Sequence, residues 1–212
     1  MSLLASAPGV RCDEEVLRTA TGNPSTALAR SAARAALGAA QAWGTSVHPE
    51  HLISLVAGDQ IDWIRARHDA GYELISLLRR NPLEHVLSAA IAQERGQWHD
   101  VGETEQSTAP VRLDPIAVLR EAGLAERSAR DVQTMVADRS HLALVYEDDL
   151  RDGAKHQGTV DRVFTFLGLP SHPVSSPFRR RSVGLLEQIA NAEEIVAALR
   201  ATRFHDFVAE IS

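Results

Sequence analysis

The stretch YELISLLRRNPLEHVLSAAIAQERGQWH, which runs from Tyr72 to His99, holds a short apolar run, a basic turn and a long amphipathic segment. Residues 72–78 are mostly apolar and bounded on both sides, which is typical of a buried strand in an α/β sheet. Pro82 can open a helix, because the first helical turn does not need the amide that proline lacks. The apolar positions that follow at helical spacing are Leu83, Val86, Leu87, Ala90 and Ile91. The stretch therefore predicts a strand, a turn and a helix.

Two arginines, Arg79 and Arg80, lie in the predicted turn. Ligands of open α/β sheets bind outside the carboxyl ends of the strands, and arginines that face the start of a helix can bind phosphate. Ser88 follows Arg80 by eight residues, which is about two helical turns. Its hydroxyl can share an anion with Arg80 only if the helix axis runs past the ligand. On these residues alone, a structural strand–helix unit whose arginines pair with surface acids remains the alternative.

Arg80 and Ser88, placed in this way after a strand, resemble the 3′-phosphate-binding motif of the PAPS-dependent sulfotransferases. PAPS is 3′-phosphoadenosine 5′-phosphosulfate. The residues that resemble the bacterial branch of this family, which includes the trehalose sulfotransferases, are Gln93, Gly96, Gln97 and Trp98. The resemblance extends over nearly the whole chain. It implies an α/β fold of the P-loop nucleotide-transferase kind, in which a mostly parallel sheet is flanked by helices, with PAPS as co-substrate and no metal.

A second group of basic residues follows a proline- and serine-rich loop and consists of Arg179, Arg180 and Arg181. It resembles the basic pair that clamps the 3′-phosphate in the cytosolic sulfotransferases, although the glycine that follows that pair is not matched here. The apolar run 141–146 predicts a second strand, and the acids at 147–149 after it resemble the segment that closes a strand in this family. We interpret these acids as structural, because acids at a helix start accept hydrogen bonds from its free amides. A helix is predicted over 159–169.

The segment RCDEEVL, residues 11–17, contains the candidate catalytic base. In bacterial relatives an acid in a similar place deprotonates the acceptor hydroxyl, and the resemblance assigns this role to Glu15, with Glu14 as the substitute. Val16 and Leu17 can bury one side of the Glu15 carboxylate, which would raise its pKa. The alternative is that these acids only cap the helix that follows, where negative charge is stabilising.

The composition predicts one globular domain that spans residues 1–212, with 44% hydrophobic and 24% charged residues. A net charge of −6 argues against general binding of nucleic acid. The single cysteine, Cys12, excludes an internal disulfide and is compatible with a reducing compartment, so we expect a cytoplasmic protein. We expect no membrane span, because no apolar segment reaches roughly 18 residues.

The N-terminal segment from Ser2 to Val10 is typical of the end of a helix and a turn. In the sulfotransferases a similar segment follows the first strand and the loop that binds the 5′-phosphosulfate. The resemblance therefore predicts that the fold is N-terminally incomplete and that this 212-residue form is a poor catalyst. A sheet without a central strand would leave either an exposed gap or an edge that associates with another chain, as in a homo-oligomer.

Two further segments carry weaker predictions. Ser25 is a good N-cap for a helix that runs to about Ala42, with Arg30 and Arg34 on one solvated face to which we assign no chemistry. A short strand is expected after it, and then a helix over 53–70. His48 and His51 stand three apart, but a metal site would need a further ligand at suitable spacing, and none is evident.

The function that the resemblance implies is transfer of the sulfuryl group from PAPS to an acceptor hydroxyl on a glycan, a lipid or a small natural product. The alternative is a catalytically degenerate relative that binds a nucleotide or a partner protein. A kinase would need a Gly-x4-Gly-Lys-Ser/Thr loop, and the sequence contains none.

Overall fold

The computed structural model shows an α/β protein with two small parallel sheets and flanking helices. The residues that the structure describes are 2–13, 15–18, 20, 23–50, 52, 56, 59–96, 109–175 and 184–211. The chain divides into two compact units. The first unit combines Met1–Leu78 with Ser128–Ser176, and the second combines Arg79–Arg127 with Pro177–Ser212. The expectation of a single domain stays a prediction.

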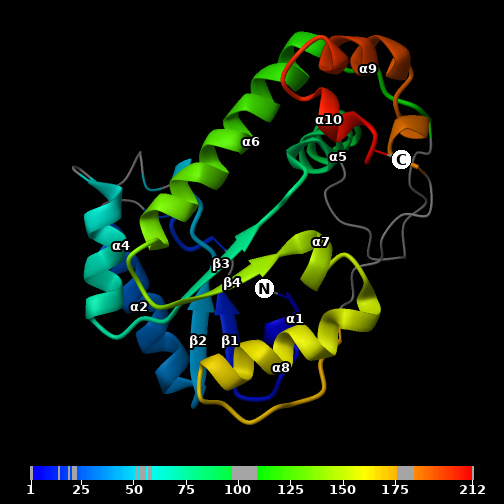
Figure 1. Ribbon diagram of the computed structural model, residues 1–212. Helices are drawn as coiled ribbons and strands as arrows, with labels where there is room; N and C mark the ends of the chain where they lie inside the picture. The colour runs from blue at the N-terminus through cyan, green and yellow to red at the C-terminus, as the bar shows by residue number, and fades with distance from the viewer. Residues whose placement is uncertain are drawn as a thin grey trace. The chain divides into compact units, whose positions relative to one another are not determined.

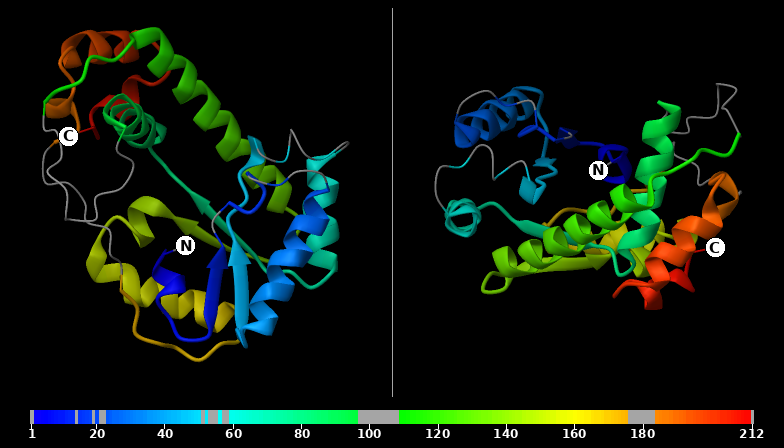
Figure 2. Two further views of the ribbon diagram at one scale, coloured as in Figure 1. Left: turned by 180° about the vertical axis from the view of Figure 1, so that it is seen from behind. Right: turned by 90° about the horizontal axis from the view of Figure 1, so that it is seen from above.

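The first sheet of the first unit is a parallel pair of strands, β1 (Val10–Asp13) and β2 (Ala42–Thr45). The chain crosses between them through α2 (Pro24–Leu37), and Figures 1 and 2 show β1 and β2 side by side. Because the strands are parallel, both carboxyl ends lie at the same edge of this sheet. The sequence predicted β2 but not β1, and α1 (Ser2–Ala5) confirms the helix end expected before it.

The second sheet of the first unit pairs β3 (Leu74–Leu78) in parallel with β4 (His141–Val145). Both strands were predicted, and β3 begins two residues later than expected. The expectation that β3 is buried was wrong, because Ile75 and Leu77 are exposed and only Ser76 of this strand is buried. A short helix, α7 (Tyr146–Asp149), follows β4 directly. Within the described residues, no ladder joins the two pairs into the one sheet that the sequence analysis expected.

Hydrophobic clusters hold the helices of the first unit in place. One cluster contains Leu28 of α2 and Ile64 of α4 (Gln60–Asp69); its other buried members are Leu17, Leu52 and Met135. A second cluster joins α1 to α8 (His156–Phe166) through Val160 and Phe164. A 3-10 turn, Gly153–Lys155, leads into α8, and Gly168, with a φ of 66°, follows its end.

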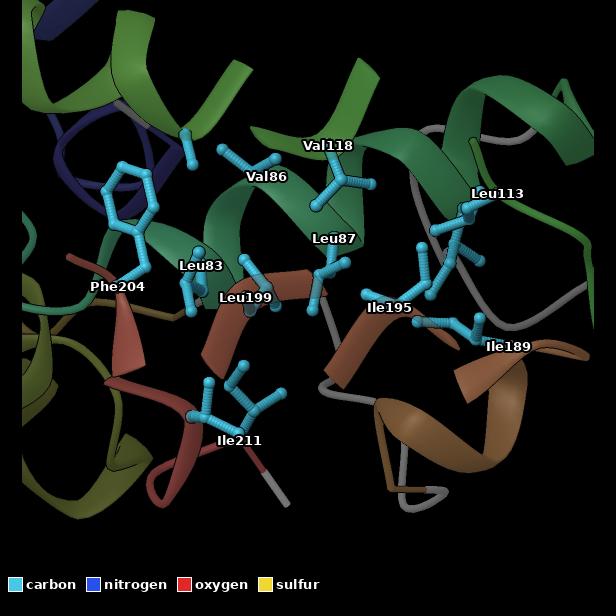
Figure 3. Close-up of a cluster of buried hydrophobic side chains, with 13 residues drawn as sticks. Leu83, Val86, Leu87, Leu113, Val118, Ile189, Ile195, Leu199, Phe204 and Ile211 are labelled. Atoms are coloured by element: carbon cyan, nitrogen blue, oxygen red, sulfur yellow. The ribbon is translucent and has the colours of Figure 1, made fainter. Parts of the chain in front are cut away.

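The second unit is helical. It contains α5 (Pro82–Arg95), the first part of α6 (Pro115–Val136), α9 (Ala192–Arg200) and α10 (His205–Val208). A 3-10 turn, Leu186–Gln188, precedes α9. Figure 3 shows the apolar core that these elements share, which includes Leu83 and Leu87 of α5 and Leu199 of α9. The predicted start of α5 at Pro82 and its apolar face are confirmed.

Several predicted helix limits were wrong. The helix expected from Ser25 begins at Pro24, because Asn23 and not Ser25 is the N-cap, and it ends at Leu37 rather than near Ala42. The helix expected over 159–169 is α8, which begins and ends three residues earlier. Of the helix expected over 53–70, the structure describes α4, whose N-cap is Asp59.

Candidate functional site

The turn that carries Arg79 and Arg80 is fixed by the residue that follows it. Asn81 is only 1% exposed, and its side-chain oxygen accepts the amide of Leu83 at 2.9 Å. Its side-chain nitrogen donates to the carbonyl of Phe207 at 3.1 Å and to Glu210 at 3.3 Å. The N-terminus of α5 is therefore anchored to the C-terminal segment, which limits the motion of the residues just before it.

Arg80 and Ser88 both occupy solvent-accessible positions in the second unit. Arg80 precedes the N-cap of α5, and Ser88 lies on the solvent side of the same helix, while its neighbour Leu87 is fully buried. An anion from solvent can therefore reach each of these two positions. Glu84 also lies in the first turn of α5 and weakens the positive potential of the helix end, so the charge available for an anion comes mainly from the arginines.

Glu15 lies two residues after the end of β1, in a strained backbone conformation. Its φ is 45°, which is uncommon for a residue other than glycine and occurs more often at functional sites than elsewhere. The backbone is held there because the amide of Glu15 donates to Ser46 Oγ and the amide of Val16 donates to Thr45 Oγ1, both at 3.2 Å.

The Glu15 carboxylate faces charged groups and is not enclosed by apolar ones. Leu17 is buried in the first unit's core, but the Glu15 side chain remains 35% exposed and forms an ion pair with Arg18. His48 Nε2 lies 3.7 Å from Glu15 Oε1, and His48 Nδ1 lies 3.7 Å from Glu50 Oε1. The imidazole thus stands between two carboxylates.

No catalytic role was predicted for His48 from the sequence. Its position beside Glu15 depends on the parallel pairing of β1 with β2, which places the residues after both strands at one edge. Since β1 was not predicted, this proximity was not foreseen. His51 lies outside the described residues.

The remaining predicted site residues are only partly accounted for. Glu14, Arg179, Arg180 and Arg181 lie outside the described residues. Glu15 belongs to the first unit, whereas Arg80 and Ser88 belong to the second. Arg80 thus lies in the turn before α5 and Ser88 lies within that helix, and Glu15 is described separately with the first unit.

The acids that follow β4 include one with clear structural contacts. Asp149 accepts the amide of Val145 at 2.7 Å and the guanidinium of Arg162 at 2.5 Å. Burial raises the pKa of Asp149, but these hydrogen bonds outweigh burial, so its pKa lies below its usual value. The Thr159 hydroxyl also donates to the Asp149 carbonyl. These contacts support the structural interpretation of the acids, because together they link the end of β4 and the short helix α7 to α8.

Among the described residues, no group of three or more histidine, cysteine or acidic side chains is arranged to hold a metal ion. In the same part of the chain, no helix is both long and apolar enough to cross a membrane. Comparisons with family models, with curated proteins and with solved structures found no match to this chain. The resemblance to the sulfotransferases therefore stays a prediction from the sequence motifs.

Proposed function

We propose that this protein is a PAPS-dependent sulfotransferase that binds the 3′-phosphate of its co-substrate through Arg80 and Ser88. The observation that carries the proposal is the connection between β3 and α5. It places an arginine at the carboxyl end of a parallel strand, in a turn fixed by a buried N-cap, with an exposed serine further along the helix. The carboxyl ends of parallel strands are where α/β proteins bind their ligands.

The chemistry of these groups suits a phosphate monoester. A guanidinium donates two parallel hydrogen bonds to phosphate oxygens, and a serine hydroxyl can donate a further one. The anchored Asn81 keeps the turn in one conformation, so less conformational entropy is lost when the ligand binds. In the proposed family Arg179, Arg180 and Arg181 would add contacts to the same phosphate.

Glu15 is the proposed general base. In the transfer step, the acceptor oxygen forms a bond to the sulfur of PAPS while the bond from sulfur to the 5′-phosphate oxygen breaks. The acceptor proton passes to the Glu15 carboxylate, and adenosine 3′,5′-bisphosphate leaves with the bonding electron pair. His48 Nε2 lies 3.7 Å from Glu15 Oε1, so a proton that leaves the carboxylate for the imidazole would pass through one water. The acceptor is a hydroxyl on a glycan, a lipid or a small natural product.

The test of the proposal is calorimetric titration with adenosine 3′,5′-bisphosphate beside adenosine 5′-monophosphate, which lacks the 3′-phosphate. Removal of one charge-assisted contact costs roughly 1.5–3 kcal/mol. Arg80→Ala should therefore weaken binding of the bisphosphate by about ten- to a hundredfold and leave binding of the monophosphate nearly unchanged. Arg127→Ala, an exposed arginine of α6 in the same unit, is the matched control.

Two results would contradict the proposal. If Arg80→Ala and Ser88→Ala bind the bisphosphate as the native protein does, these residues do not form the 3′-phosphate site. If they weaken both nucleotides equally, they contact a group other than the 3′-phosphate.

The alternative is a catalytically degenerate relative that binds the nucleotide without transferring the sulfuryl group. Incubation with radiolabelled PAPS and a panel of hydroxyl acceptors separates the two functions. Label transfer supports the enzyme, and slow transfer is the expected result. Turnover on the order of 1 s⁻¹ would contradict the prediction that this form is a poor catalyst. Binding of the bisphosphate without label transfer to any acceptor supports the degenerate relative.

A further inference from the structure

A polar cavity of about 500 Å³ lies between β1 and α2 in the first unit. β1 contributes Arg11 and Asp13 to its lining, and α2 contributes Arg30, Ser31 and Arg34. Its volume lies within the range of sites for small molecules. None of these residues takes part in the proposed sulfuryl transfer, and the sequence analysis assigned no chemistry to Arg30 and Arg34.

Asp13 lines the cavity, and both of its carboxylate oxygens accept hydrogen bonds. Its Oδ1 accepts Arg11 Nε at 3.0 Å, and its Oδ2 accepts Trp43 Nε1 at 2.9 Å and the hydroxyl of the buried Ser31. Arg11 uses only Nε for this contact, so its terminal amino groups form no hydrogen bond within the described part of the chain. They remain available to a ligand.

The arginines of α2 have no acidic partner in the part of the chain that the structure describes. The Arg30 side chain forms no hydrogen bond or ion pair there, and Arg34 donates from Nε only to the carbonyl of Arg30 at 3.4 Å. Residues four apart lie on one helix face, with Cβ atoms about 5–6 Å apart. The described residues that line the cavity include three arginines and one acid, so the lining carries two excess positive charges, which is the charge that a dianion neutralises.

We propose that this cavity binds the phosphate monoester of a small hydroxylated molecule, such as a sugar phosphate. A phosphate monoester presents three charged oxygens and close to two negative charges on one atom, and three guanidinium groups can share them. Thr26 and Asn23 also line the cavity and can hydrogen-bond hydroxyl groups of the ligand. The proposal does not depend on the sulfotransferase function.

Calorimetry on the full chain with glucose 6-phosphate as the probe tests the proposal. The native protein should bind glucose 6-phosphate, more weakly as salt is added because exposed charges are screened, and should not bind glucose. The double variant Arg30→Ala/Arg34→Ala should lower the affinity by about tenfold or more. Arg30→Lys keeps the charge but not the planar fork, so its loss should be smaller. Arg130→Ala, an exposed arginine of the same unit outside the cavity, should bind like the native protein.

Other outcomes would overturn the proposal. Unchanged affinity in the double variant, or no binding by the native protein, removes the site. Equal or tighter binding of succinate shows a dicarboxylate site, and equal or tighter binding of inorganic phosphate shows a site for the free anion. Displacement of glucose 6-phosphate by adenosine 3′,5′-bisphosphate shows that the cavity belongs to the nucleotide site.

Discussion

Two of the strand–helix connections of this protein begin their helices with the same dipeptide and use it differently. Asn23-Pro24 opens α2 and Asn81-Pro82 opens α5, and each asparagine accepts an amide two residues later at 2.9 Å. Asn23 is exposed, and its side-chain contacts stay within the first turn. Asn81 is buried and reaches the C-terminal segment. Both dipeptides set the start of a helix, but only the buried one also anchors distant parts of the chain.

The connections also differ in length, and the proposed functions follow that difference. Residues 79–81 make a short turn between β3 and α5, which suits recognition of one phosphate at one point. Residues 14–23 form a longer connection between β1 and α2. This connection carries Glu15 and contributes Val16, Ala20 and Asn23 to the lining of the cavity. We expect the short turn to bind the 3′-phosphate. We expect the long connection to supply the catalytic base and to line the cavity that binds a phosphate monoester.

The largest effect is expected for Glu15→Gln, which tests whether the long connection carries the catalytic base. Glutamine keeps the shape of the side chain but accepts no proton, and a positioned base contributes roughly 10²–10⁴-fold to the rate. In protein that transfers label from PAPS, kcat should fall by about that factor, while affinity for adenosine 3′,5′-bisphosphate stays nearly unchanged. The measurements are steady-state kinetics and calorimetry.

Glu14→Gln is the control for this prediction, since Glu14 is the neighbouring acid and the substitute candidate. If Glu14→Gln loses activity and Glu15→Gln keeps it, the base is Glu14. If both variants remain fully active, no base lies in this segment. A loss of bisphosphate affinity in Glu15→Gln would contradict the separation of the two connections.

Asn81→Ala should destabilise the protein more than the equivalent change in the other connection. The variant loses the helix cap, typically about 1 kcal/mol, and removes the donor to the Phe207 carbonyl, which costs roughly 1–3 kcal/mol when the group is buried. We expect a loss on the order of 2–4 kcal/mol in the free energy of unfolding. Urea unfolding followed by circular dichroism measures it.

Asn23→Ala is the matched control, because it removes only a cap and should cost about 1 kcal/mol. Asn81→Asp sharpens the comparison, since it keeps the cap acceptor, removes the donor to Phe207 and adds a negative charge near Glu210. Equal losses for the two alanine variants would show that the contacts of Asn81 with the C-terminal segment add no stability.

The connection between β3 and α5 could be predicted from the sequence, because it carries strong local signals. Five residues of β3 are apolar or small, Pro82 marks the helix start, and the apolar face of α5 keeps a helical period. β1 was missed, because it is only four residues long, two of its residues, Arg11 and Asp13, are charged, and it leads into acids that suggest a helix cap. The offset in α2 arose because Asn23 and Ser25 are both good N-caps.

The candidate sites show the same difference between residues that a local pattern reveals and residues that only strand pairing brings together. Arg80 and Ser88 stand out in sequence because they belong to one continuous segment. The proximity of His48 to Glu15, and of Trp43 to Asp13, joins residues that lie about thirty positions apart. It depends on the pairing of β1 with β2, which no local pattern encodes.

The smallest expected effect is the pH-dependent stabilisation that Asp13 contributes at the end of β1. Asp13 ends β1, whereas the apolar Leu78 ends β3. Partial burial raises the pKa of Asp13, but hydrogen bonds from Ser31, Trp43 and Arg11 outweigh burial, so its pKa lies below its usual value. A carboxyl whose pKa is lower in the folded state stabilises the protein at pH values above its pKa in the unfolded chain, about 3.9. That stabilisation is lost as the pH falls through the folded pKa.

Asp13→Asn should therefore be less stable than the native protein at pH 7, by about 1 kcal/mol or less because the side chain is partly exposed to solvent. The difference should shrink as the pH falls below about 4, since the native carboxyl then also becomes neutral. Urea midpoints of both proteins between pH 7 and pH 2 measure this difference, and the contribution of Asp149, which has a similarly lowered pKa, cancels because both proteins carry it. A difference that stays constant over this range would show that the loss comes from packing around Trp43 and Ser31. Charge at the end of β1 would then add nothing to stability, and the contrast with the uncharged end of β3 would disappear.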